Sequence, residues 1–96
     1  MSKPHYANHD LAVRDLRVHN SLDALAFLLE QGRELEFTFQ EKSYFLSLFH
    51  SQKHVSLWCC GTEQPFENFK DLTVQATLDG IPFLTAWEQV HLDYLF

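Results

Sequence analysis

The stretch HSQKHVSLWCC, residues 50–60, holds the side chains of this sequence that are best suited to metal chemistry. A structural zinc site needs four histidine or cysteine ligands, each within about 2.0–2.3 Å of one ion. His50 and His54 stand at the start of the stretch and Cys59 and Cys60 at its end, and a strand separates such pairs by about 3.3 Å per residue. Neighbouring strand residues also point to opposite faces, so the two cysteines would diverge. We therefore expect a β-hairpin here, with no bound metal or cofactor.

Nucleophilic catalysis by a cysteine is the other chemistry that this stretch could offer. It requires a base and electropositive surroundings that lower the thiol pKa. The neighbours in sequence are instead Glu63 and Glu67, whose negative charges would raise it. This argues against catalysis, so a small thiol- or metal-dependent enzyme using Cys59, Cys60 and His54 is kept only as the alternative function. A thiol pKa below that of free cysteine would favour this alternative.

A pair of carboxylates stands in the segment 33–40. Glu34 and Glu36 share one face of a predicted strand, and two strand residues of the same face lie about 7 Å apart. That separation would suit acid–base catalysis. Alternating glutamates on a solvated strand are the commoner arrangement, so no catalytic residue is assigned.

Composition and charge exclude several partners. The 96 residues suit one domain, and the 46% hydrophobic content argues against disorder. The net charge is −6, and residues 54–96 hold one basic residue, Lys70, against six acidic ones. An acidic chain repels phosphate, which disfavours nucleic-acid binding. No segment has the roughly 20 apolar residues that cross a membrane, and no apolar run follows Met1, so we expect no signal peptide and a cytoplasmic protein.

The periodicity of apolar residues predicts an α+β fold. An apolar stripe predicts a helix over 21–31. Alternation from residue 34 to 60 predicts three antiparallel strands with turns at 41–42 and 51–52. The first turn would place Phe39 opposite Tyr44. The second would place Phe45 opposite Trp58.

Residues 61–96 are expected to form short helices and a strand, separated by turns. Gly61 and Pro65 are expected to end the third strand, and a short helix is expected over 66–72. A helix over 82–89 with Pro82 at its first position follows an Asp-Gly turn. In the final strand Val90, Leu92, Tyr94 and Phe96 alternate with His91 and Asp93, so those four should share a face.

These elements give three to four antiparallel strands with helices packed on one face. The domain should cover residues 21–96. Residues 1–19 form an N-terminal segment, for which short extended pieces and a loose helix both remain open.

Large aromatic residues fall on the sheet face that should be wet. The predicted pairing sets Phe45 opposite Trp58, with Phe49 two positions along, and such aromatics mark a covered or a binding surface. Either residues 1–19 or the last strand covers them, or they bind a partner. In the second case Glu34 and Glu36 would form an acidic rim, and the partner would be another protein or a second copy of the chain.

The order of elements adds a resemblance. The ending LDGIPFLTAWEQVHLDYL, preceded by a helix, an EFTF strand and a hairpin, resembles small uncharacterised proteins of Gram-positive bacteria and their phages over residues 21–96. The turn at 41–42, where Asn-Gly would be typical, and Pro82 after the Asp-Gly turn depart from that pattern. The resemblance implies the order of elements and brings no catalytic residues.

The function expected from the sequence is a non-enzymatic, cytosolic protein-interaction module of bacterial type. Its small size and acidity would suit an inhibitor, an immunity-type protein or a phage-encoded accessory protein.

Overall fold

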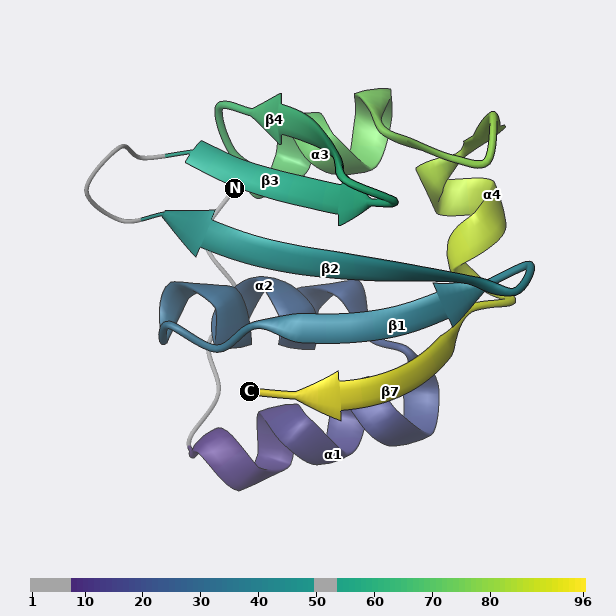
Figure 1. Ribbon diagram of the computed structural model, residues 1–96. Coiled ribbons are helices and arrows are strands. Elements are labelled where there is room, and N and C mark those ends of the chain that lie inside the picture. Colours follow the sequence, from purple (N-terminus) through teal and green to yellow (C-terminus); the bar gives the residue numbers. More distant parts are fainter. Residues whose placement is uncertain (1–7, 50–53) are drawn as a thin grey trace.

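The described part of the protein contains a main antiparallel sheet, with a layer of helices on one of its faces, and a small two-stranded sheet. The computed structural model describes residues 8–49 and 54–96, and this part of the chain has four helices, none of which lies in front of the sheet in Figure 1. The α+β class is confirmed, but the sheet has five strands instead of three or four, in the order β4-β3-β2-β1-β7. In chain order the elements are α1 (His9–His19), α2 (Leu22–Glu30), β1 (Leu35–Phe39), β2 (Lys42–Phe49), β3 (His54–Cys59), β4 (Thr62–Phe66), α3 (Phe69–Gln75), β5 (Thr77–Leu78), β6 (Ile81–Pro82), α4 (Phe83–Trp87) and β7 (His91–Leu95).

The predicted pairing of β2 with β3 is confirmed, whereas that of β1 with β2 is wrong by two residues. Phe45 lies opposite Trp58 as expected. Tyr44, however, lies opposite Phe37 and not Phe39, because the turn is formed by Gln40 and Glu41. A shift of two residues keeps every side chain on its predicted face. The turn expected at residues 51–52 lies outside the described residues.

The extra strand β4 results from a second tight turn. Cys60 and Gly61 have φ of 54° and 81°, and Cys59 lies opposite Thr62 across them. Two successive residues with positive φ form the turn type that matches the twist of a hairpin. The third strand does end before Gly61, as expected, but the chain turns back at once and Pro65 lies inside a further strand that was not predicted. Pro65 is accommodated because β4 is an edge strand, where a missing N–H costs little.

The open alternative for the N-terminal segment is resolved in favour of a helix over its described part. The Asn8 side chain accepts a hydrogen bond from the Leu11 N–H at 2.9 Å and so begins α1. Asn20, with φ of 50°, ends it. The buried residues Ala12 and Leu16 place α1 in the same core as the rest of the chain.

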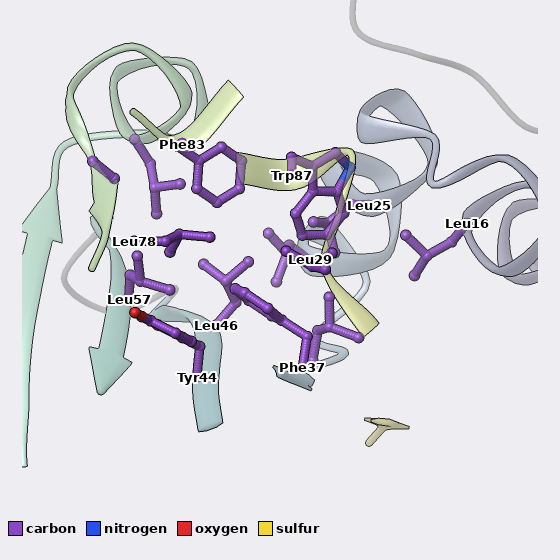
Figure 2. Close-up of a cluster of buried hydrophobic side chains, with 14 of the residues drawn as sticks. Leu16, Leu25, Leu29, Phe37, Tyr44, Leu46, Leu57, Leu78, Phe83 and Trp87 are labelled. Atoms are coloured by element: carbon purple, nitrogen blue, oxygen red, sulfur yellow. The ribbon is translucent and has the colours of Figure 1, made fainter. Parts of the chain in front are cut away.

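The core lies between the helices and the inner face of the sheet (Figure 2). Phe37 is fully buried, and its ring stacks on Tyr44 at 5.4 Å and meets the edge of Trp87 at 5.5 Å. Trp87 in turn donates from Nε1 to the Asn20 carbonyl at 2.8 Å, which joins α4 to the turn between α1 and α2. The helix α4 is shorter than the expected 82–89, and Pro82 is its N-cap residue instead of its first helical position.

Replacing Phe37 with alanine should lower the free energy of unfolding by about 3–5 kcal/mol, because a buried aromatic ring leaves a cavity. The neighbouring change Glu36→Ala is the control, since Glu36 is only half-buried and on the opposite face. It should cost less than about 0.5 kcal/mol. Urea denaturation of both variants checks this, and equal shifts of the two midpoints would contradict the assignment of faces.

Candidate functional site

The sheet face that points away from the helices, called the outer face below, is the candidate site. Figure 1 shows no helix or strand of the described residues in front of it. Alternation along the strands sends every second side chain to it. Its residues are Glu34, Glu36, Thr38, Ser43, Phe45, Ser47, Phe49, His54, Ser56, Trp58, Glu63, Pro65, His91, Asp93, Tyr94 and Phe96.

Aromatic side chains from β2, β3 and β7 and from the residue after β7 gather on the outer face. Phe45 lies opposite Trp58, and its ring is 6.0 Å from that of Phe96. Tyr94 follows at 6.1 Å from Phe96, and these two side chains are 62% and 55% exposed. Phe49, at the far end of β2, stacks on His54 at 4.9 Å. The predicted residues Phe45, Phe49 and Trp58 are thus on one surface, together with two aromatics that were not predicted.

The missed residues, Tyr94 and Phe96, were expected to share a face with Leu92. The pairing of β7 with β1 shifts between Glu36 and Phe37, so that Asp93 is an extra residue in β7. Such a bulge moves all later side chains of the strand to the other face. The bulge cannot be recognised from the alternation of apolar residues, because Tyr94 and Phe96 suit either face of the sheet.

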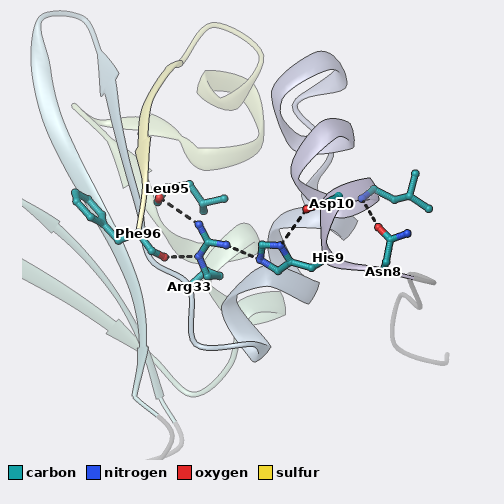
Figure 3. A network of polar contacts seen from close by, with 7 residues as sticks. Asn8, His9, Asp10, Arg33, Leu95 and Phe96 are labelled. Atoms are coloured by element: carbon teal, nitrogen blue, oxygen red, sulfur yellow. Dashed lines mark hydrogen bonds and ion pairs between the residues drawn. The ribbon is translucent and has the colours of Figure 1, made fainter.

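Arg33 fixes the position of Phe96, as Figure 3 shows. Its Nε donates to the Phe96 carbonyl at 2.6 Å, and a second nitrogen donates to the Leu95 carbonyl at 3.3 Å. A third nitrogen contacts His9 Nε2, which links this end of the chain to α1. The backbone groups of Phe96 also pair with those of Glu34, at 2.7 and 3.1 Å. The Phe96 ring is therefore carried by an ordered backbone.

The carboxylates of the outer face are held between the aromatics. Glu34 accepts a hydrogen bond from the hydroxyl of Ser47 at 2.7 Å, and Glu63 accepts one from Ser56. Both serines are buried, and a buried hydroxyl requires a hydrogen-bond partner. The two carboxylates supply that partner and are thereby held in position. Glu36 lies between Phe45 and Tyr94 and therefore inside the aromatic surface instead of at a rim.

Asp93 is a carboxylate of this face that two neighbouring side chains hold in place. Thr38 Oγ1 donates to its Oδ2 at 2.6 Å, and His91 Nδ1 lies 2.8 Å from its Oδ1. These contacts hold the pKa of the Asp93 carboxyl below its ordinary value of 3.8, with the threonine hydrogen bond as the largest cause. The bulge that exposes Tyr94 is thus fastened by a polar contact between two strands.

The residues considered for catalysis or metal binding do not come together. His54 lies at the start of β3, with its Nε2 3.8 Å from the Glu63 carboxylate, and Cys59 lies about 17 Å along the same strand. Burial is the main cause that raises the pKa of the Cys59 thiol. The described residues contain no group of three or more His, Cys, Asp or Glu that could hold a metal ion, and His50 lies outside them.

One expectation about the cysteines is wrong. Cys59 and Cys60 do not diverge, because Cys60 is in a turn and its Sγ lies 3.3 Å from that of Cys59.

Comparison with known proteins adds no identification. The chain matches no protein-family model, and no curated protein and no solved structure matches it. Within residues 8–49 and 54–96, no helix is long and apolar enough to cross a membrane.

Replacing Asp93 with asparagine should lower stability near neutral pH and much less in acid. The folded pKa of Asp93 is lowered, so its carboxylate stabilises the fold above pH 3.8 and loses that effect as the pH falls through the folded value. The gap between the urea midpoints of wild type and variant should therefore close in acid. Glu67→Gln, an exposed change between β4 and α3, is the control. A gap that stays constant with pH would contradict the role of this charge.

Proposed function

We propose that the protein is a non-enzymatic interaction module that binds another protein through its outer face. The observation that carries the proposal is the joint exposure of Tyr94, Phe96 and Phe49 beside the Phe45–Trp58 pair on an open sheet. Tyrosine and tryptophan are enriched among the residues that dominate binding energy at protein interfaces. Contiguous aromatic surface on a single domain is characteristic of a binding site.

The charges of the outer face favour a partner with arginine or lysine. Among its described residues the charged groups are four carboxylates and two histidines, with no lysine or arginine. Two copies placed face to face would bring eight carboxylates together, which disfavours a homodimer through this surface. Arginine suits such a site because it pairs with carboxylates and stacks on aromatic rings. The partner is therefore a protein with a basic and partly apolar surface.

A cytosolic inhibitor, immunity-type protein or phage-encoded accessory protein fits this proposal. Proteins of these classes act by covering a surface of their target and need no catalytic groups of their own. The resemblance of residues 21–96 to small proteins of Gram-positive bacteria and phages supports the same setting. Electrostatic complementarity would make the association fast and sensitive to salt.

Trp58 should be quenched by acrylamide, and by caesium ions more than by iodide. Trp58 is half-buried on the outer face opposite Glu63, so cations gather near it. Trp87 is 3% exposed and serves as the shielded reference in the same chain. Trp58→Phe should remove the quenchable fraction and leave the circular dichroism unchanged. Equal quenching by both ions, or a shielded Trp58, would show that this face is covered or not acidic.

Site-specific photo-cross-linking tests partner binding directly. A benzoylphenylalanine is placed at Tyr94 on the outer face or at Leu84 on α4, which are 62% and 50% exposed, and the chain is expressed in its host. One protein should cross-link from position 94 only. Its yield should fall at least about tenfold with Trp58→Ser, since loss of an interface anchor costs more than about 1.4 kcal/mol. Equal yields from both positions, or no effect of Trp58→Ser, would contradict the proposal.

A further inference from the structure

We propose that Cys59 and Cys60 form a two-thiol binding site for a trivalent metalloid, such as a singly substituted arsenical. Their Sγ atoms lie 3.3 Å apart, and both cysteines are free. Cys60 is exposed and Cys59 half-buried, so a ligand reaches the first thiol from solvent and closes onto the second. This site lies at the turn between β3 and β4 and is separate from the aromatics of the outer face.

The backbone of the turn is what brings the two sulfurs together. Along a regular strand the side chains of adjacent residues point to opposite faces. Cys60 leaves the strand with φ of 54°, a left-handed conformation that is unfavourable for residues other than glycine. The ladder between Cys59 and Thr62 holds the turn in place. The arrangement is therefore a property of the folded hairpin and is absent from an extended chain.

A disulfide bond between Cys59 and Cys60 does not fit this geometry. Bonded sulfurs lie about 2.05 Å apart, on residues whose Cα atoms are usually 4.4–6.8 Å apart. Adjacent residues have Cα atoms about 3.8 Å apart, so a bond between Cys59 and Cys60 would be strained and readily reduced. A single atom bonded to both sulfurs avoids this strain, because it lets them stay near their present separation of 3.3 Å.

Zinc is also a poor match. Two Zn–S bonds of about 2.3 Å at the tetrahedral angle put the sulfurs about 3.8 Å apart, and two further ligands are needed. The described residues offer no group of three ligating side chains at this turn. A trivalent arsenic atom that carries one carbon substituent is pyramidal, has narrower bond angles, and needs only two sulfurs.

The surroundings of the thiols are compatible with this reaction. Burial raises the pKa of Cys59, and the hydrogen bond with Cys60 raises it further, so this thiol is protonated at neutral pH. The hydrogen bond with Tyr44 and, to a smaller degree, the ammonium of Lys42, held 2.7 Å from Asp79, offset part of this rise in pKa. An arsenic(III) oxide group, As=O, condenses with two neutral thiols. Two As–S bonds form, the oxygen leaves with both thiol protons as water, and no electron is transferred.

The test uses the reduced full-length chain and phenylarsine oxide as the probe. After an excess of glutathione, a monothiol, intact-mass spectrometry should find one phenylarsenic group per wild-type chain. Cys59→Ser and Cys60→Ser should each release it, because a chelate exceeds single-site affinity by about 10²–10⁴-fold. The dithiol 2,3-dimercaptopropanol should remove it from the wild type.

A relocated thiol is the matched control. The variant Cys60→Ser/Asp10→Cys keeps two thiols but places one on the first turn of α1, where the side chain is fully exposed. It should behave like Cys60→Ser, with an unchanged circular dichroism spectrum. Retention of the probe by this variant or by Cys60→Ser, or its loss from the wild type to glutathione, would overturn the proposal.

Discussion

The pairing of β2 with β3 is the interaction on which both faces of the molecule depend. It runs from Tyr44 opposite Cys59 to Phe49 opposite His54 without a shift. This one register sends Leu46 and Leu57 into the core and Phe45 and Trp58 to the other side. A slip of one residue would exchange the two sets. The stability of the core and the aromatic outer face are therefore two results of the same alignment.

The helices cover one side of this sheet, and no other described helix or strand lies over the opposite side. The α1–α2 pair packs against the inner face through α2, and the α3–α4 pair does so through α3 and through Trp87, whose ring meets Phe37 (Figure 2). Antiparallel sheets with one free face normally show polar side chains there. Here the buried serines Ser47 and Ser56 alternate with aromatics along β2 and β3. The outer face thus combines aromatic side chains with carboxylates that the serine hydroxyls hold in position.

Sequence reasoning found what depends on the alternation of apolar residues and missed what depends on backbone irregularity. The faces of β1, β2 and β3 follow from apolar content, so Phe45 and Trp58 could be placed. The turn at Gln40 and Glu41 could not, because neither residue favours the positive φ that it adopts there. The pairing between the two strands determines the position of that turn. The conformational preferences of the turn residues alone do not reveal it.

The bulge at Asp93 and the turn at Cys60 were missed for a related reason. Each is one residue that departs from the strand conformation, and each changes the direction of the side chains beside it. Tyr94 and Phe96 became part of the outer face in this way, and the two thiols became neighbours. The residues that depart from regular structure are thus those that shape both proposed sites.

The two outermost strands of the sheet also determine how chains can assemble. An exposed edge strand can add a strand from another molecule, which leads to aggregation. In β4, Pro65 lacks the N–H that such an addition needs, and in β7 the extra residue Asp93 interrupts the edge and adds a charge. Strand addition is disfavoured at both edges of the sheet, so the outer face is the surface left for contact with a partner protein.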